Sequence, residues 1–299
     1  MKITSSRLRL LSLIAMALLF PPEGRAEVAT HGDESPGRTV VILEVNRLTD
    51  GDGPWGSVWE SHSTEEQVHV LNGDGEANQD GQPTILLHPH TRVPIVAWPR
   101  RTATGYDIVV SRFRNGSWDE PSVVAIGDGG TLDPYLIADP TTGEVHLFYR
   151  MGEGRPHIEH RSASDDATSW SGATVVSAPG EIAVRPSAAW HLGRLLVAYE
   201  VHVDALEGAS RQIVVAEPDG ATWINEIVAS TAHNGRSDPQ IHSDGTRIWV
   251  DWIDAPDALS WTCREDDGSW ASLETEAFSG AEDREYHVRG RVKRAVRER

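Results

Sequence analysis

The sequence LDPYLIADPTTGEVHLFY, residues 132–149, decides the fold because its pattern occurs four times in the chain. In each copy, a short apolar run opens with a proline, a polar turn follows, and a second apolar run ends in an aromatic residue. The prolines of the four copies are 51, 52 and 53 residues apart, at Pro83, Pro134, Pro186 and Pro239. This regular spacing is typical of a protein built from repeated supersecondary units.

Each repeat continues with two more short runs that are rich in β-branched or aromatic residues and are bounded by Gly, Asp, Asn or Pro. The second run ends at Trp98, Tyr149, Tyr199 or Trp252, and the fourth run opens at Trp118, Trp170, Trp223 or Trp270. None of these runs has the 3.6-residue period of a helix. Four short strands in a repeat of about fifty residues are typical of a propeller blade, which predicts an all-β fold.

The repeats also suggest how many blades the chain forms. Four full repeats cover residue 82 to about residue 278, and the segment before them contains a partial unit with expected strands at 40–45, 58–61 and 67–71. In the tail, Tyr286, Val288 and Val292 alternate with polar residues at strand spacing. We predict a β-propeller domain over residues 39–299 with about five four-stranded blades, closed into a ring by the terminal strands. Six blades are the alternative.

The first 26 residues have the pattern of a secretory signal peptide. A basic start is followed by the apolar run 10–20 and by Gly24-Arg25-Ala26, which has small residues at both positions that determine cleavage. Eleven apolar residues are too few to span a bilayer, and no later stretch is apolar enough for a membrane helix. We therefore expect cleavage near Ala26, a linker over 27–38, and a secreted or periplasmic protein.

Composition excludes several classes of protein. The 299 residues include 45 acidic and 27 basic side chains, and the net charge of −18 argues against nucleic acid as a partner. A single cysteine, Cys263, excludes a disulfide framework and a Cys-rich zinc module. We expect no cofactor and no metal, although oxygen-bearing side chains alternate over residues 72–80 and leave calcium as an alternative. His88 and His90 have no third ligand in view, so we expect surface histidines.

The turns before the fourth run carry a family resemblance. Asp165, Ser169 and Trp170 match the box Ser-x-Asp-x-Gly-x-Thr-Trp, while Ala163 and Ala167 replace its Ser and Gly. Over residues 82–278 the repeats resemble the sialidase-type propellers with bacterial neuraminidase (Asp-box) repeats. The resemblance implies a propeller that handles glycans. The Arg-Ile-Pro segment that commonly carries the first catalytic arginine of sialidases has no counterpart in this chain.

A second resemblance concerns the start of two repeats. The steps Asp133-Pro134 and Asp238-Pro239 look like the Asp-Pro step that often carries a catalytic carboxylate in five-bladed glycosidases that cleave furanosides. An aspartate before proline is also an ordinary way to start a turn.

Strand parity predicts which residues share a face. In an up-and-down blade the residue before the first strand lies on the same side as the loop between the second and third strands, and the first strand is innermost. The residues expected to ring the central funnel are therefore Gln82, Asp133, Arg185 and Asp238, and loops of the same face add Arg101, Arg150 and Glu200.

These residues give the candidate site. Asp133, Asp238 and Glu200 are the catalytic candidates, because paired carboxylates can supply the acid and the base for glycoside hydrolysis. The ligand-binding candidates are Gln82, Arg185, Arg101 and Arg150, with Trp98, Tyr149, Tyr199 and Trp252 as a sugar-stacking platform. Two alternatives remain: Arg185 only neutralises the neighbouring aspartates, and the aromatic residues only pack between blades.

Two functions follow from this pattern. The first is an exported, sialidase-like propeller that recognises a glycan through the funnel face and, in the stronger form, hydrolyses it as a glycoside hydrolase. The second is a non-catalytic extracytoplasmic scaffold that binds another envelope or extracellular protein. The sequence leaves the choice open because propellers serve many unrelated functions.

Overall fold

The structure is a computed structural model of the chain. It describes residues 26–32, 39–45, 66–70, 80–127, 129–164, 166–203, 210–231, 237–255, 258–265 and 267–277. Every helix or strand assigned in these ranges is a strand, which agrees with the all-β prediction. Within the same ranges, no helix has the length and apolar character needed to cross a membrane.

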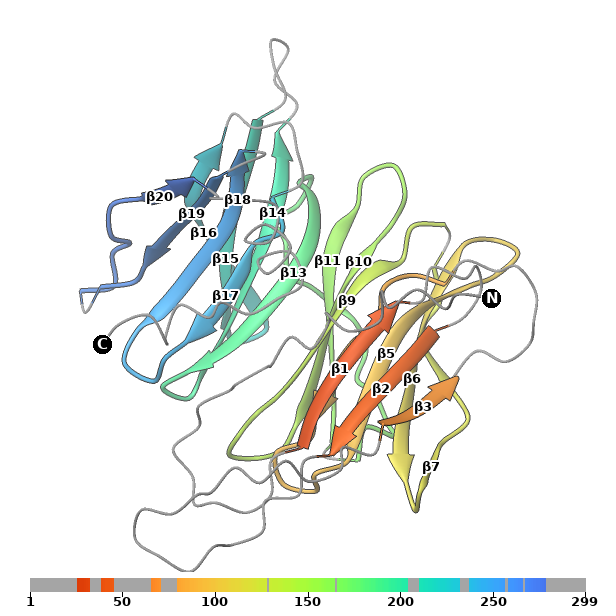
Figure 1. Cartoon of the computed structure of the whole chain (residues 1–299). Helices are drawn as coiled ribbons and strands as arrows, with labels where there is room; N and C mark the ends of the chain where they lie inside the picture. The colour runs from red at the N-terminus through yellow and green to blue at the C-terminus, as the bar shows by residue number, and fades with distance from the viewer. Residues whose placement is uncertain are drawn as a thin grey trace, which may run out of the picture.

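The strands form antiparallel sheets in which neighbours along the chain are also neighbours in the sheet, except for one short strand (Figure 1). The first sheet contains β1 (Ala26–Gly32), β2 (Thr39–Val45) and β3 (Glu66–Val70). The second contains β4 (Thr84–Leu87), β5 (Pro94–Arg101), β6 (Tyr106–Arg114), β7 (Ser117–Trp118) and β8 (Ser122–Ala125), and its exception is β8, which pairs with β6.

The next three sheets each have four strands. The third contains β9 (Leu132–Ala138), β10 (Val145–Met151), β11 (His157–Ala163) and β12 (Thr174–Val175). The fourth contains β13 (Ile182–His191), β14 (Arg194–Val203), β15 (Ser210–Asp219) and β16 (Thr222–Thr231). The fifth contains β17 (Gln240–Ser243), β18 (Ile248–Ala255), β19 (Ala258–Cys263) and β20 (Glu274–Ala277).

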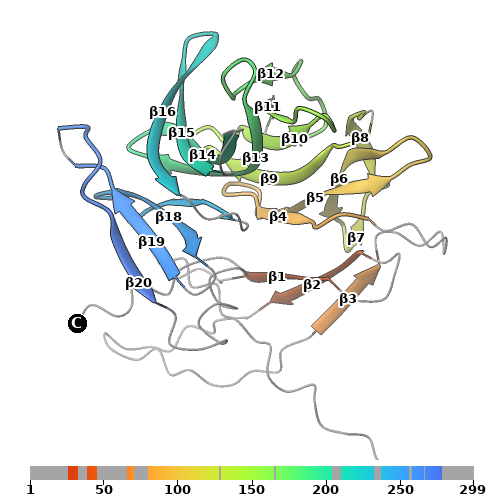
Figure 2. The ribbon, with the colours of Figure 1, turned by 90° about the horizontal axis from the view of Figure 1, so that it is seen from above.

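The sheets are arranged radially, as in a propeller. The first strands of successive sheets contact one another in the order β1, β4, β9, β13 and β17. In Figure 2, which views the molecule from above, the sheets follow one another in chain order around a common centre. The first strand of each repeat is therefore the innermost strand of its sheet.

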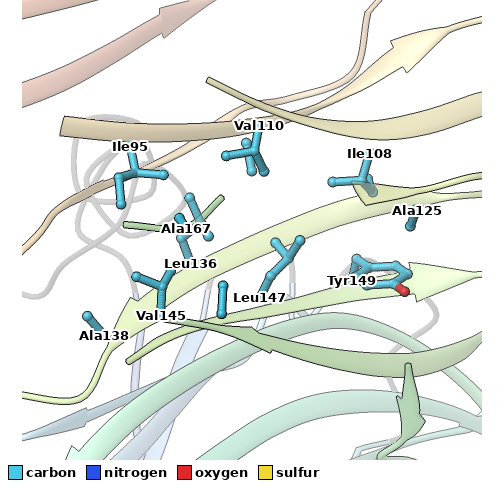
Figure 3. Packing of buried hydrophobic residues seen from close by; sticks show 12 residues of the cluster. Ile95, Ile108, Val110, Ala125, Leu136, Ala138, Val145, Leu147, Tyr149 and Ala167 are labelled. Atoms are coloured by element: carbon cyan, nitrogen blue, oxygen red, sulfur yellow. The ribbon is translucent and has the colours of Figure 1, made fainter. Parts of the chain in front are cut away.

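The core lies between adjacent sheets. Between the second and third sheets, Ile95 and Ile108 pack against Leu136 and Leu147 (Figure 3). Comparable clusters lie between the third and fourth sheets and between the fourth and fifth. The second strand of a sheet is covered on both faces, as in β10, where every residue from Val145 to Tyr149 is buried. Burial on both faces explains why these strands are continuous apolar runs in the sequence.

The structure corrects two expectations about strand boundaries. Residues 26–32 form β1 and pair with β2, so the first half of the expected linker over 27–38 is strand, and residues 33–38 lie outside the described residues. Of the four repeated tryptophans, only Trp223 lies at the start of a long outer strand. Trp118 ends the two-residue β7, while Trp170 and Trp270 form isolated bridges ahead of β12 and β20. The expected strand at 58–61, the tail strand and the segment before Ala26 lie outside the described residues.

Candidate functional site

Three charged residues at equivalent repeat positions have an unusual backbone conformation. The φ angles of Asp133, Arg185 and Asp238 are 54°, 56° and 44°, in the left-handed region. Residues other than glycine seldom adopt this region, and each of the three precedes a proline. Such strain costs about 1–3 kcal/mol for each residue and clusters at functional sites.

Strand pairing shows how the sequence produces this conformation. The register between β9 and β10 shifts beside the Asp133-Pro134 step, and the register between β13 and β14 shifts beside Arg185-Pro186. A proline cannot donate a hydrogen bond to the ladder, so a bulge accommodates it. Both bulges occur on the first strands of their sheets and contain the charged residue together with its proline. Gln82, at the corresponding place before β4, is exposed and is not left-handed.

Glu200 is the best-connected carboxylate of this region. Its side chain on β14 has no exposed surface. Arg185 donates from Nη1 to Oε2 over 2.9 Å, and the backbone N–H of Ser237 donates to the same oxygen over 3.0 Å. His202 Nε2 lies 2.7 Å from Oε1, which Arg211 also contacts. A buried carboxylate is tolerated when its charge and both oxygens are matched in this way.

Arg185 links the fourth sheet to the fifth. Its Nε atom lies 3.2 Å from Oδ1 of Asp238, which immediately precedes Pro239 and β17. The side chain of Arg185 is 25% exposed and that of Asp238 is 11% exposed, so Arg185 is partly accessible and Asp238 is nearly buried. Burial lowers the pKa of the nearby Arg211 guanidinium, and the positive charge of Arg185 lowers it further.

A second ion pair lies in the third sheet at the corresponding positions. Arg150 Nε lies 3.5 Å from Oδ2 of Asp133, with side-chain exposures of 23% and 31%. Here the residue before proline is acidic and its partner on the second strand is basic, whereas the fourth sheet has Arg185 and Glu200 in the opposite arrangement. We call these residues the funnel ion-pair network: Asp133, Arg150, Arg185, Glu200, Arg211 and Asp238.

The burial of Glu200 corrects its expected role. A side chain with no exposed surface, whose oxygens face two guanidinium groups, an imidazole and a backbone N–H, cannot touch a substrate. Glu200 is therefore a positioning residue for Arg185 and Arg211 and is not a catalytic one. Asp133 keeps 31% of its side-chain surface exposed, whereas Asp238 keeps only 11%.

The expected aromatic platform is wrong, because all four side chains are buried. The exposed fraction is 0% for Trp98, Tyr149 and Tyr199 and 1% for Trp252. Tyr199 donates to Asn225 Oδ1 over 2.9 Å and to Glu181 over 3.2 Å, and Trp98 Nε1 donates to Asp80 over 3.1 Å. These residues pack between sheets, which is the alternative that the sequence left open.

Tyr149 follows the same pattern. Its hydroxyl donates to Glu159 over 2.7 Å and accepts a hydrogen bond from Arg161 Nε over 3.0 Å. Burial raises the pKa of Tyr149, and burial also raises that of Tyr199, with the charge of Glu181 as the next cause. Both phenols therefore stay protonated and act as hydrogen-bond donors in the core.

Arg101 ends β5, at the loop between the second and third strands where it was expected, and of the two histidines His90 is exposed as expected. The guanidinium carbon of Arg101 lies 4.9 Å from the centre of the Tyr106 ring in its own hairpin. His88 is fully buried, so the expectation of a surface histidine is wrong for it. Its Nδ1 accepts from two backbone N–H groups at 3.3 and 3.1 Å, and Nε2 lies 2.8 Å from the carbonyl oxygen of Gly143. Both ring nitrogens are thus engaged and neither can bind a metal.

The loop over residues 72–80, where calcium was the alternative to no metal, lies mostly outside the described residues. Of residues 72–80, the structure describes Asp80, whose carboxylate accepts from Trp98 Nε1 and from the backbone N–H of Arg101 over 2.9 Å. Among the described ranges, no group of three or more His, Cys, Asp or Glu side chains gathers in a way that could hold a metal ion. Cys263 is buried, and burial raises the pKa of its thiol.

Sequence reasoning missed Arg211 and Ser237. Arg211 lies on β15 directly opposite His202 on β14, so pairing the two strands in register would have placed it beside Glu200. Ser237 precedes Asp238 in the next repeat and contributes only its backbone N–H to Glu200. No side-chain pattern could have revealed that contact.

Comparisons with known proteins agree on the fold and leave the family open. No protein-family model and no curated protein matches the chain. A protein of unknown function from Dyadobacter fermentans superposes with a TM-score of 0.50 at 15% identity, covering 66% of this chain and 69% of that one.

Other matched structures are glycan-processing enzymes. A glycosyl hydrolase from Bacteroides ovatus has a TM-score of 0.44 at 10% identity over 66% of this chain and 71% of its own. An α-L-arabinofuranosidase from Lactobacillus brevis has a TM-score of 0.44 at 11% identity over 85% of this chain and 87% of its own. Of these three structures, the Dyadobacter protein alone reaches a TM-score of 0.50, and at 15% identity that likeness concerns the fold alone.

Proposed function

We propose that the chain is an exported propeller that recognises a glycan through the funnel ion-pair network. The observation that carries this proposal is the placement of Asp133, Arg185 and Asp238. Each is charged and has a strained backbone; Asp133 is the second residue of β9, Arg185 lies inside β13, and Asp238 lies just before β17. Natural sequences keep backbone strain of this kind where function requires a fixed side chain.

The chemistry of these side chains suits a sugar. A carboxylate accepts hydrogen bonds from hydroxyl groups, and a guanidinium donates to them, so adjacent pairs serve both capacities of a hydroxyl. Asp133 and Arg150 offer such a pair at 31% and 23% exposure. Arg185 and Asp238 offer a second pair across the seam between the fourth and fifth sheets.

The overall architecture belongs to the same proposal. We infer five four-stranded blades, with a strand from the tail completing the first sheet and closing the ring, and a signal peptide that directs export. The order of contacts from β1 to β17 supports the radial arrangement. The sialidase-type likeness of the turns stays part of this proposal, supported by a left-handed Ala167 (φ 50°) at the position of the glycine of the box.

Recognition is the function that the geometry supports best, with hydrolysis as its stronger form. Asp133, which is partly exposed, and Asp238, which is nearly buried, are the carboxylates that would supply acid and base. Each of them faces an arginine. A carboxylate paired with an arginine stays ionised, so it can accept hydrogen bonds from sugar hydroxyl groups and can stabilise positive charge that develops on the sugar during hydrolysis.

A glycan array tests this proposal, with the purified chain and a double variant that removes one whole ion pair. Asp133→Ala with Arg150→Ala deletes the exposed pair without leaving a lone charge, and we expect a loss of binding of about tenfold or more. The matched control is Arg112→Ala with Asp119→Ala, a pair at 3.0 Å on the second sheet, which should bind like the wild type. Binding to no glycan, or equal binding by both double variants, would reject the proposal.

Chromogenic pyranosides, furanosides and sialosides test for hydrolysis. If a substrate is cleaved, Asp133→Asn and Asp238→Asn should each abolish turnover while circular dichroism shows an unchanged fold. Turnover that survives both substitutions would place the chemistry elsewhere.

A further inference from the structure

The arginines of the funnel ion-pair network are all opposite carboxylates. Arg150 faces Asp133 at 3.5 Å. Two nitrogens of Arg185 face different carboxylates, with Nη1 at 2.9 Å from Glu200 and Nε at 3.2 Å from Asp238. Arg211 contacts the other oxygen of Glu200. No arginine of this network presents its guanidinium fork to the funnel without a protein carboxylate beside it.

The charges of the network balance among the residues that the structure describes. Three arginines and three carboxylates form the described network, and their formal charges sum to zero. A site that grips a carboxylate needs a guanidinium whose paired N–H groups can meet both oxygens of the ligand. Here a ligand carboxylate would have to displace Asp133 or Asp238 or lie against it, and like charges in contact are strongly unfavourable.

The surroundings act in the same direction. The chain carries a net charge of −18, which repels polyanions at long range. Moving a charged ligand out of water also carries a desolvation penalty, and an arginine that is already paired with a protein carboxylate does not compensate it. An uncharged hydroxyl meets neither penalty, because it can donate to Asp133 or Asp238 and accept from Arg150 or Arg185.

We propose that the ligand is an uncharged, hydroxyl-rich saccharide, and that Asp133 and Asp238 exclude sugars that carry a carboxylate. This inference rests on the proposed function. It assigns a selectivity role to the two aspartates: they mask Arg150 and Arg185 from anionic ligands. Removing the negative charge from either aspartate should therefore uncover an arginine and admit a carboxylate.

The test is an array in which each neutral glycan is printed beside its C6-oxidised, uronate-containing form. Binding is measured at about 0.15 M salt, where long-range charge effects are largely screened. The wild type should bind the neutral member of a pair better by about tenfold or more. Asp133→Asn and Asp238→Asn should each shift that ratio toward the oxidised member by about tenfold. The control Asp219→Asn removes the same charge from an exposed turn and should leave the ratio unchanged.

The outcomes separate the two proposals. Preference of the wild type for oxidised glycans, or an unchanged ratio in both aspartate variants, would overturn the selectivity role while glycan recognition stands. An equal shift in Asp219→Asn would show that net charge sets the ratio and would overturn it too. Binding to neither member of any pair would overturn both proposals. The two variants lie in different sheets, so misfolding of one leaves the other to decide.

Discussion

Glu200 Oε2 lies 2.9 Å from Arg185 Nη1, although the Glu200 side chain has no exposed surface and Arg185 is 25% exposed. The pairing of β13 with β14 places Val184 opposite Glu200, so the bulge at Arg185 brings the next side chain onto the same carboxylate. Arg185 then reaches Asp238 at the start of the fifth sheet. One buried carboxylate thereby fixes the orientation of an arginine that joins two sheets.

Neutralising Glu200 should destabilise the protein strongly. In Glu200→Gln, Arg185 and Arg211 lose their shared buried counter-charge, and breaking a buried ion pair typically costs about 3–5 kcal/mol. We expect the free energy of unfolding, measured by urea denaturation, to fall by roughly 3 kcal/mol. Glu120→Gln, at an exposed position, should change it by less than about 0.5 kcal/mol. A loss of similar size in both variants would contradict the role of the network.

The repeat pattern predicted the inner part of each sheet because burial there leaves a strong signal in the sequence. The apolar runs ending at Trp98, Tyr149, Tyr199 and Trp252 are the second strands β5, β10, β14 and β18. The outer strands carry a weaker signal, since one face is exposed. Val175 in β12 and Ile224 in β16 are more than half exposed, so these strands lack a continuous apolar run. The repeated tryptophan was therefore the main sign of a fourth strand, and it gave the wrong start in three of the four repeats.

The sequence predicted which charged residues occupy equivalent repeat positions, and only partly how they pair. Proline spacing placed Asp133, Arg185 and Asp238 at equivalent positions, and the structure brings Arg185 to Asp238. The burial of Glu200 was not predictable, because it depends on Arg211 from the next strand and on a backbone N–H from the next repeat. The prediction of a sugar-stacking platform failed for a related reason. Whether an aromatic residue at the end of a strand is exposed or buried depends on how the neighbouring sheet covers it.

A histidine pair should make the seam between the third and fourth sheets sensitive to acid. Nδ1 of His146 lies 3.0 Å from Nε2 of His160, and the rings of Trp190 and Trp223 pack against the pair. Burial, together with His146, lowers the pKa of His160 to about 3. Burial also lowers the pKa of His146, against the charges of Glu144 and Asp139, which raise it.

The sign of the pH dependence follows from these shifts. An unfolded histidine has a pKa of about 6.5, so between about pH 6.5 and 3 the unfolded chain binds more protons than the folded one. The neutral histidine pair therefore makes its whole contribution to the free energy of unfolding above about pH 6.5. This contribution is lost as the pH falls, and the total loss is roughly 3–5 kcal/mol. We expect His160→Phe to flatten the decline in unfolding free energy between about pH 7 and 4, measured in urea. His90→Phe, at an exposed histidine, should keep the wild-type slope. Equal slopes in all three proteins would rule out the pair as the cause.

Tyr199 should matter for stability and not for ligand binding. In Tyr199→Phe, Glu181 and Asn225 lose a buried donor, which should lower the free energy of unfolding by about 1–2 kcal/mol. Binding to any glycan found on the array should stay unchanged, because the ring has no exposed surface. Tyr106→Phe is the control on an incompletely buried tyrosine and should alter stability little. If Tyr199→Phe is as stable as the wild type but binds glycan more weakly, Tyr199 contributes to ligand binding and this prediction is wrong.

Leu192 offers the reverse case, a position where substitution should stabilise. His191 and Arg194 pair across the end of the β13–β14 hairpin, so Leu192 and Gly193 form a two-residue turn with φ angles of 48° and 77°. Such a turn favours Asn-Gly, and a leucine in the left-handed region costs about 1–2 kcal/mol. The side chain is 78% exposed, so little packing is lost on its removal.

Leu192→Asn should raise the free energy of unfolding by about 1 kcal/mol and the Tm by about 2–4 °C. Ile126→Asn removes an equally exposed side chain, at 77%, from a residue that is not left-handed, and should give no gain. A Tm for Leu192→Asn at or below that of the wild type would show that the turn does not strain this residue.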